Sequence, residues 1–586
     1  MVERRKRSYN GVAGGRINKG GKSMRKIWIV ALAAVLASGM SGCLDDDNNY
    51  DYKPINGLKG GIQNFGNFKV EYSVIEGEEL KLAPTFQFTI DDTPDVSYEW
   101  YVDQKLQNEE TEATFVFKAD KSGTHEVTFV VKDNKSGVRF AMSTFVKVRS
   151  IYQRGWCILS DEGGRSVLHF IVPTTFTYET IYKGEKVLRD SLVYHDVRKD
   201  ILPDLGRNPV GLMEHIGEMD YRGDKGIEIY DELLVKQDQW VELNGNTLER
   251  EVYTAQEFKD DLPVGFAPKE AAMTYSAKAI LDENGLLYWM NKGDIADFHA
   301  GFYTSVGLNN NQKFSRLFES HKWNKYYCDV VLALRAEDNS LVGIYNGGEA
   351  NRGTTITENS QLKCGTVFEI TGEESFNNID KEVIDALPAA YDISYWGYDV
   401  TTVTCGWLAL LKDKESNKYD LRYFLLDGER DGVTCKSYYE YPGITIGDYR
   451  GMAVFNNRHY AVIADGCQLY YFQYFEDNDT GTPGSATMMP LGEAFSSPIK
   501  ALHGLDLMPE YDSDSYCGQL GVALEDGSFY IFGVNEMLSG EGVCNSVSRK
   551  QLFPDENTSD ENKNFGKVVD VIYKLGRGTD YSLFAF

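Results

Sequence analysis

The sequence predicts an all-β protein, and three observations carry that prediction. Aromatic residues make up 13% of the 586 residues, with 37 Tyr and 30 Phe beside only 15 Pro, which favours strands over disorder or helical bundles. Apolar and polar residues alternate over short segments, the period that places one face of a strand in a core. A hairpin pattern also recurs over most of the chain. At this length we expect at least two domains, or one large repeat domain.

Residues 1–42 have the order of a secretory signal region. A basic segment precedes an apolar run at 27–37, which is too short to be a stable membrane span. Residues 1–23 precede a better start at Met24 and resemble an over-extended start, so we leave them out of the fold prediction. Met40-Ser41-Gly42-Cys43 resembles a bacterial lipobox, in which Cys43 receives the lipid. The alternative is a chance cysteine after an ordinary signal peptide.

Residues 43–65 are expected to form a lipidated acidic tether. Asp45, Asp46 and Asp47 come after the cysteine and resemble the export signal that Bacteroidota use to place lipoproteins on the outer face of the outer membrane. A solvated linker is the plainer alternative. Removing residues 1–42, which hold nine Lys or Arg and one Glu, takes the formal net charge from −28 to −36. Such a body repels nucleic acid and anionic lipid headgroups, so we expect only the lipid to hold it to the membrane.

Residues 66–148 are expected to form a small sandwich of short strands. Alternation is clear at 114–117 and 126–133, and Gly123 and the segment 134–137 supply turns. The strand with Trp100, the strand from Gly123 to Asp133 and the segment 145–148 resemble a PKD-type domain. That resemblance implies an immunoglobulin-like sandwich whose core Trp100 fills. Another sandwich family of similar size is the alternative.

Residues 151–586 contain a repeated hairpin made of an apolar strand, a turn and an aromatic-rich strand. The clear copies are 155–161 with 167–170, 278–282 with 286–289, 330–334 with 341–345, 407–411 with 421–426, 460–464 with 469–472, and 520–524 with 529–532. Two weaker copies are 232–235 with 240–241, and 571–575 with 581–584. A hairpin cannot bury its apolar face alone, so we predict a β-propeller of seven or eight blades. A β-solenoid or several sandwiches are alternatives, and only short stretches such as 378–387 suggest helix.

No catalytic motif is apparent. The sequence holds no GxSxG elbow, HExxH pair or P-loop, so we assign no catalytic residue and no cofactor. The eight histidines are scattered, which argues against a metal site, because affinity needs three or four convergent ligands. Asp297 and His299 could present two ligands, and the segment from Asp477 resembles half a calcium loop but lacks its closing Glu. We interpret both as ordinary loop residues and predict no metal.

Aromatic residues provide the candidate binding site. Tyr395, Trp396 and Tyr398 lie in one stretch with Gly397, and Tyr438, Tyr439 and Tyr441 form a second group. Rings on loops can stack on sugars or anchor a protein partner. The alternative, that they pack between blades, is the commoner fate of aromatic strand residues.

The order of lipobox, acidic tether, PKD-like sandwich and Tyr-rich repeats resembles the PKD-like family lipoproteins of Bacteroidota. The resemblance implies an accessory lipoprotein beside a TonB-dependent transporter and its lid lipoprotein. We therefore expect a non-catalytic surface protein of a nutrient uptake system, with a glycan or peptide ligand. The rival hypotheses are a polysaccharide lyase or glycosidase acting in the propeller channel, and a structural subunit that docks on the transporter.

Overall fold

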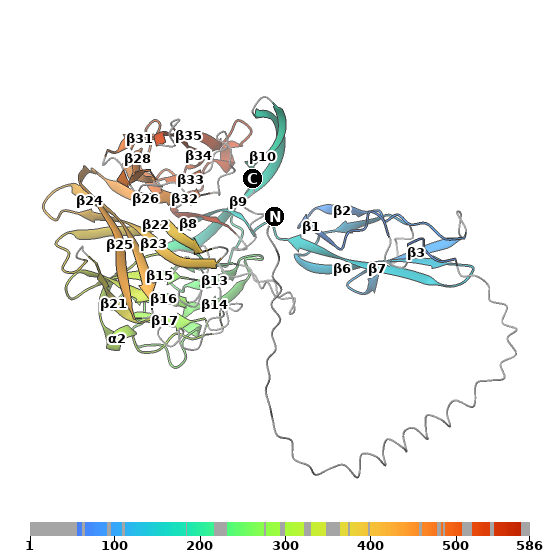
Figure 1. The fold of residues 1–586 in the computed structure, drawn as a ribbon, viewed down its shortest axis with the longest axis horizontal. Coiled ribbons are helices and arrows are strands. Elements are labelled where there is room, and N and C mark those ends of the chain that lie inside the picture. The colour runs from blue at the N-terminus through green and yellow to red at the C-terminus, as the bar shows by residue number, and fades with distance from the viewer. Residues whose placement is uncertain are drawn as a thin grey trace, which may run out of the picture.

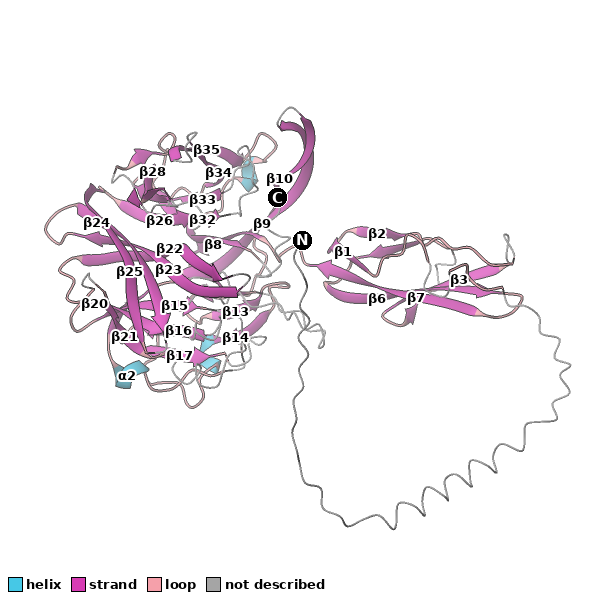
Figure 2. Cartoon of the chain, viewed as in Figure 1, coloured by secondary structure: helices cyan, strands magenta, loops and turns pink. Residues whose placement is uncertain are grey.

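The computed structural model confirms the predicted fold class. It describes residues 56–575 except for 61–64, 91–94, 108–111, 183–184, 216–230, 275–276, 293–298, 300, 321–329, 347–363, 373–375, 397–398, 430, 456–459, 478–481, 484–486, 507–517 and 539–543. Within the described residues, strands dominate and helix is confined to α2 (Leu308–Asn311) and the 3-10 turns η1 (Thr254–Gln256) and η3 (Asp560–Asn562). Figures 1 and 2 show a small sandwich of strands and, after it, a larger body of sheets.

The sandwich is built around one tryptophan. One sheet has the order β1-β7-β6-β3-β4, and β2 pairs with β5 in a second sheet. Their bounds are β1 (Glu71–Ile75), β2 (Glu79–Leu82), β3 (Val96–Val102), β4 (Lys105–Leu106), β5 (Phe115–Lys118), β6 (Gly123–Asp133) and β7 (Arg139–Arg149). Trp100 is fully buried, and its ring centre lies 4.5 Å from that of Phe129 and 5.0 Å from that of Phe115. Aromatic packing of this kind adds to the burial of apolar area.

The rest of the described chain, apart from one small hairpin, forms six sheets, one of which has eight strands and contains two blades. We call the resulting seven units blades 1 to 7. Blade 1 has the order β36 (Val568–Lys574), β8 (Gly155–Glu162), β9 (Arg165–Tyr182) and β10 (Glu185–Arg198); blade 2 has β11 (Gly211–His215), β12 (Glu232–Lys236), β13 (Val241–Asn244) and β14 (Arg250–Tyr253); blade 3 has β15 (Pro268–Met273), β16 (Ala277–Asp282) and β17 (Leu287–Asn291). Blade 4 has β18 (Phe314–Leu317), β19 (Val330–Arg335), β20 (Ser340–Tyr345) and β21 (Val367–Thr371); blade 5 has β22 (Glu382–Trp396), β23 (Asp399–Lys412), β24 (Lys418–Glu429) and β25 (Gly432–Thr445). Blade 6 has β26 (Tyr449–Phe455), β27 (Tyr460–Asp465), β28 (Gln468–Gln473) and β31 (Met489–Pro490); blade 7 has β32 (Ile499–Asp506), β33 (Gly518–Leu524), β34 (Phe529–Leu538) and β35 (Cys544–Phe553); β29 (Phe475–Asp477) and β30 (Thr482–Pro483) form a separate hairpin.

The blades close into a ring. The last described strand, β36, pairs antiparallel with β8 and so supplies the inner strand of blade 1. On its other sides β36 packs against β32 of blade 7 and β11 of blade 2. The outer strands β21 and β25 also pair, in parallel, and join blades 4 and 5 into one eight-stranded sheet. These pairings define a seven-bladed β-propeller whose ends meet in blade 1.

A separate apolar cluster fills each junction between neighbouring blades. The seven clusters contain, in ring order, Leu159 with Leu212, Met213 with Ile280, Leu281 with Val331, Leu332 with Trp407, Leu408 with Ile463, Val462 with Leu520, and Phe529 with Trp156. Each sheet is therefore apolar on both faces, which explains why the middle strands read as continuous apolar runs rather than alternating ones.

The repeat seen in the sequence corresponds to the second and third strands of each blade, counted from its inner strand. All six clear copies form such hairpins, and the weak copy at 232–235 forms β12 and β13. The copy at 571–575 is different, because it pairs with β8, and its expected partner at 581–584 lies outside the described residues.

The helix expected at 378–387 is wrong. From Glu382 these residues form the start of β22, which pairs with the end of β23. Val383 and Ala386 are buried there, so tertiary burial outweighs local helix propensity. In the part of the chain that the structure describes, no helix has the length and apolar character needed to cross a membrane. Cys43 and Asp45 to Asp47 lie outside that part.

Candidate functional site

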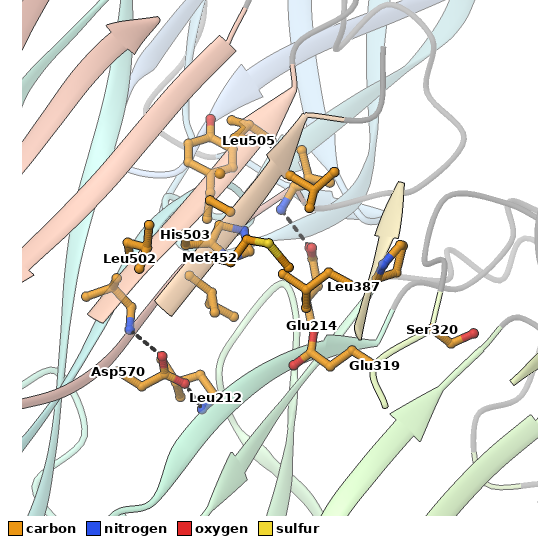
Figure 3. A pocket seen from close by; sticks show the side chains of 18 residues that line it. Leu212, Glu214, Glu319, Ser320, Leu387, Met452, Leu502, His503, Leu505 and Asp570 are labelled. Carbon is orange, nitrogen blue, oxygen red and sulfur yellow. Dashed lines mark hydrogen bonds between the residues drawn. The ribbon is translucent and has the colours of Figure 1, made fainter. Parts of the chain in front are cut away.

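The inner strands of six blades surround a central cavity of about 220 Å³ (Figure 3). Its walls come from β11, the residues after β18, β22, β26, β32 and β36. The lining residues are Leu212, Glu214, Glu319, Ser320, Leu387, Pro388, Met452, Ala453, Val454, Leu502, His503, Gly504, Leu505, Asp570, Val571, Ile572, Tyr573 and Leu575. Most of these residues are apolar, and the ionisable groups other than Tyr573 are three carboxylates and one imidazole.

Backbone groups hold two of these carboxylates in place. Glu214 Oε1 accepts a hydrogen bond of 2.6 Å from the N–H of Leu575. Asp570 accepts 2.8 Å bonds from the N–H groups of Leu212 and Val571. Glu319, the third, is half-buried, and Figure 3 shows its side chain beneath that of Glu214.

The cavity is electronegative. Burial raises the pKa of Asp570 and the charge of Glu319 adds to this, which together outweigh the charge of Lys236 and the backbone hydrogen bonds. Burial also raises the pKa of the neighbouring Asp385 to about 6, again with Glu319 adding to the rise. No Lys or Arg is among the lining residues that the structure describes. A neutral or positively charged ligand therefore fits this cavity better than an anion.

Of the predicted aromatic site, the structure describes only the backbone of Tyr395 and Trp396. Tyr395 and Trp396 end β22, where their backbones pair with Val400 and Asp399 of β23. Their side chains and the whole of Tyr398 lie outside the described residues.

The second aromatic group packs inside the propeller, in agreement with the alternative interpretation. The ring of Tyr439 stacks on that of Tyr423 with 6.3 Å between centres. Tyr438 meets the edge of Phe376 at 5.9 Å. The buried Tyr441 donates its hydroxyl hydrogen to the carbonyl oxygen of Tyr474. These rings therefore serve the packing of blades 4 to 6.

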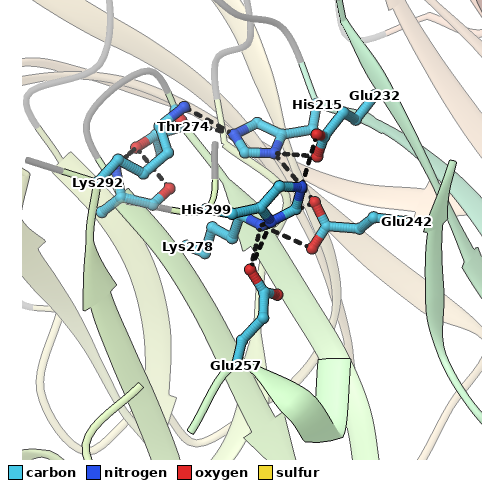
Figure 4. Close-up of polar contacts among 9 residues, drawn as sticks. His215, Glu232, Glu242, Glu257, Thr274, Lys278, Lys292 and His299 are labelled. Atoms are coloured by element: carbon cyan, nitrogen blue, oxygen red, sulfur yellow. Dashed lines mark hydrogen bonds and ion pairs between the residues drawn. The ribbon is translucent and has the colours of Figure 1, made fainter. Parts of the chain in front are cut away.

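A buried charged cluster lies between blades 2 and 3 (Figure 4). Blade 2 contributes His215, Glu232 and Glu242, and the blade 3 side contributes Glu257, Lys278, Lys292 and His299. His215 and Glu232 stand opposite each other in the β11–β12 ladder. All but His299 are buried, and the His299 side chain is 29% exposed.

Ion pairs connect the cluster. Lys278 Nζ lies 2.8 Å from both oxygens of Glu242 and 2.8 Å from Glu257 Oε1. His299 uses both ring nitrogens, with Nε2 2.8 Å from Glu232 Oε1 and Nδ1 2.8 Å from Glu257 Oε1. Although burial opposes it, contact with these two carboxylates raises the pKa of His299 to about 10. His299 and Lys278 are therefore both positively charged at neutral pH.

His215, in contrast to His299, is uncharged at neutral pH. Burial, together with the charge of Lys292, lowers the pKa of His215 to about 3, so its ring is neutral. Its Nε2 lies 3.2 Å from the carbonyl oxygen of Thr274 and 2.8 Å from Lys292 Nζ. Burial and the charge of Lys278 lower the pKa of Lys292 to about 7. A neutral Lys292 amine and the Thr274 carbonyl can both accept from an Nε2–H group.

Sequence reasoning missed this cluster because its members are far apart in the chain. The scatter of the histidines is a poor guide, since the fold brings His215 and His299 to one place. The sequence suggests an ordinary loop residue at His299, but the ring lies in ion pairs, while Asp297 is outside the described residues. A usable signal was present, since Glu242 and Lys278 interrupt apolar strand segments where a charge must be paired.

The fold and cavity define the class of protein: a small β-sandwich joined to a seven-bladed propeller with an acidic central cavity. Within that class, residues 43–198 match the model of the PKD-like family. The match begins at Cys43 and ends at Arg198, the last residue of β10. It therefore covers the sandwich and the three outer strands of blade 1.

No curated protein matches the chain. Solved structures with some similarity include a quinonprotein alcohol dehydrogenase-like protein from Bacteroides thetaiotaomicron, with 12% identity, coverage of 87% of this chain and 98% of that one, and a TM-score of 0.33. Another is yeast RCC1 (Prp20) bound to Kap60, with 12% identity, coverage of 65% and 80%, and a TM-score of 0.33. At these scores the likenesses say nothing about the activity of this chain.

Proposed function

We propose that the chain is a lipid-anchored binding protein on the outer face of the outer membrane, and that it serves nutrient uptake without catalysis. In this proposal lipid on Cys43 anchors the chain, the sandwich acts as a spacer, and the propeller recognises the ligand. The observation that carries the proposal is the central cavity, which six blades line with apolar side chains and a few fixed carboxylates. Pockets of that composition are typical of ligand sites.

The size and charge of the cavity indicate the kind of ligand. At about 220 Å³ it is smaller than the roughly 300–1,000 Å³ usual for small-molecule pockets, so it suits a terminal or side group of a larger ligand. Carboxylates that face an apolar wall accept hydrogen bonds from hydroxyl or ammonium groups. A glycan end or a basic peptide side chain meets both requirements.

A binding assay tests this proposal. The chain from Leu44 onward is incubated with a panel of neutral glycans and peptides, and both retention and product are measured. We expect retention without product, and we expect Glu319→Gln to weaken it by roughly tenfold, the effect of losing one charged hydrogen bond. Glu382→Gln, at an exposed position on the same ring, is the matched control and should leave binding unchanged.

Two results would contradict the proposal, and each would favour one of the rival functions. Product formation that Glu319→Gln abolishes would favour the rival hypothesis of a lyase or glycosidase that uses the channel carboxylates. Absence of any retained ligand, with co-purification of an outer-membrane barrel from native membranes, would favour a structural subunit that docks on a TonB-dependent transporter and its lid lipoprotein.

A further inference from the structure

Three ligand-type atoms converge inside the charged cluster. His215 Nδ1 lies 3.6 Å from Glu242 Oε2 and 4.0 Å from Glu232 Oε2. All three residues are buried, and each offers one ligand atom such that the three atoms lie within 4.8 Å of one another. Bonds of about 2.1 Å to a tetrahedral ion place neighbouring ligand atoms roughly 3.4 Å apart, so small side-chain shifts would let one ion reach all three.

One of these atoms, Glu232 Oε2, lacks a hydrogen-bond partner in the described part of the chain. Glu232 is only 4% exposed, and its Oε2 has no hydrogen-bond partner among the described residues. It faces His215 Nδ1 at a distance too long for a hydrogen bond. Burial and the charge of Glu242 raise the pKa of Glu232 to about 8, so this carboxyl group holds a proton at neutral pH. A bound cation would replace that proton and satisfy the buried oxygen.

The remaining atoms of the three residues are already held in the way that metal ligands usually are. Glu232 Oε1 contacts His299 Nε2 at 2.8 Å, and both oxygens of Glu242, the proposed ligand Oε2 included, contact Lys278 Nζ at 2.8 Å. His215 Nε2 lies 3.2 Å from the carbonyl oxygen of Thr274 and 2.8 Å from Lys292 Nζ, which can both accept its hydrogen when the lysine is neutral. A histidine that donates its far N–H to a backbone carbonyl presents the lone pair of its other nitrogen to a metal, and such outer contacts orient the ligands.

We propose that His215, Glu232 and Glu242 form a binding site for one divalent transition metal, with Zn²⁺ and Mn²⁺ as the preferred ions. The ligands would be His215 Nδ1, Glu232 Oε2 and Glu242 Oε2. Imidazole with two carboxylates favours such ions over Ca²⁺ or Mg²⁺, which prefer oxygen ligands. Three protein ligands leave a coordination position open for water. The site joins strands of blade 2 beside blade 3, and it does not depend on the function proposed for the central cavity.

Metal titration tests the proposal directly. The chain from Leu44 onward is stripped with a chelator and titrated with Zn²⁺ by calorimetry. We expect one equivalent to bind, and we expect His215→Ala and Glu232→Gln each to weaken binding by roughly 100-fold or more, as for the loss of a ligand. His195→Gln on β10 and Glu249→Gln, an exposed residue of blade 2, are matched controls that should bind as the unaltered chain does.

A spectroscopic measurement on the unaltered chain guards against variants that fail to fold. Bound Co²⁺ should show visible absorption without the near-ultraviolet band of a thiolate ligand, because no cysteine is in the proposed set. A thiolate band would place the ion elsewhere and overturn the proposal. It would also be overturned by a chain that takes up no Zn²⁺, Mn²⁺ or Co²⁺, or by folded His215→Ala and Glu232→Gln variants with undiminished affinity.

Discussion

At the scale of single residues, the propeller places ionisable side chains where water is scarce. The groups around the central cavity and those between blades 2 and 3 both have displaced pKa values because burial penalises the charged form. Sequence reasoning could predict which strands are buried, but it could not predict which charges meet, because pairing across blades joins residues far apart in the chain. Glu232 and Lys278 illustrate this, since each stands beside apolar residues of its own strand and meets its charged partners in other parts of the chain.

Asp385 gives a pH-dependent prediction. Burial and Glu319 raise its pKa from 3.8 to about 6, against the opposing charge of Arg316 and a 3.3 Å hydrogen bond from the Tyr449 hydroxyl. Because the folded-state pKa is above the unfolded value, its stabilising contribution is complete below pH 4 and is lost as the pH rises through 6. Asp385→Asn should therefore raise the free energy of unfolding at pH 7 by about 3 kcal/mol relative to the unaltered chain.

Urea unfolding between pH 4 and pH 8 measures this effect. The gain should shrink toward pH 4, and a gain that is constant with pH would contradict the assignment. Asp413→Asn is the control, because hydrogen bonds from the N–H of Glu415 and from Ser416 lower the pKa of Asp413. Its contribution has the opposite sign, since it is present above the unfolded pKa and lost as the pH falls.

At the scale of elements, the sequence predicts the middle hairpin of each blade and little else. Those hairpins are apolar on both faces and have recognisable turns, so the sequence pattern that predicts them is strong. Inner and outer strands are shorter or more polar, and their partners are set by the ring. The segment 571–575 shows the limit, because its apolar pattern suggests a hairpin with 581–584, whereas ring closure pairs it with β8. Blade number likewise depends on closure rather than on local pattern.

Packing between blades 7 and 1 gives an element-scale prediction. A Cβ atom on Gly521 of β33 would lie 2.3 Å from Cζ3 of the buried Trp156 on β8. Gly521→Ala should therefore lower the free energy of unfolding by about 1–3 kcal/mol through overpacking. Gly432→Ala is the matched control, because a Cβ atom there would meet nothing within 4 Å. Chemical denaturation monitored by tryptophan fluorescence compares the two, and equal stabilities would refute the packing argument.

At the scale of the whole molecule, the order of parts suggests a body displayed away from a membrane. The sandwich precedes the propeller, and the PKD-like match begins at the cysteine expected to carry lipid. The formal net charge of −36 expected after removal of residues 1–42 gives the body no electrostatic attraction to anionic headgroups. If lipid on that cysteine is the anchor, the location of the protein in the cell depends on the few residues from Cys43 to Asp47, which precede the first strand.

Two sets of substitutions test the location. Cys43→Ala should move the protein from the membrane fraction to the soluble fraction, because the proposal places the whole anchor on this one thiol. Replacing Asp45, Asp46 and Asp47 with Ala should remove the protein from the cell surface and leave it membrane-bound. Digestion of intact cells with added protease and subsequent immunoblotting read out both. An unaltered protein that resists such protease would show that surface display is wrong.

The antiparallel pairing of β36 with β8 has a mechanical consequence. A pull on an anchor at the amino-terminal end reaches the propeller through β8, which lies between β36 and β9. Tension along a strand that is bonded on both sides loads two ladders of backbone hydrogen bonds in shear, so many bonds must break together. A ring whose first strand is clamped by its last can therefore resist drag from a large ligand without opening.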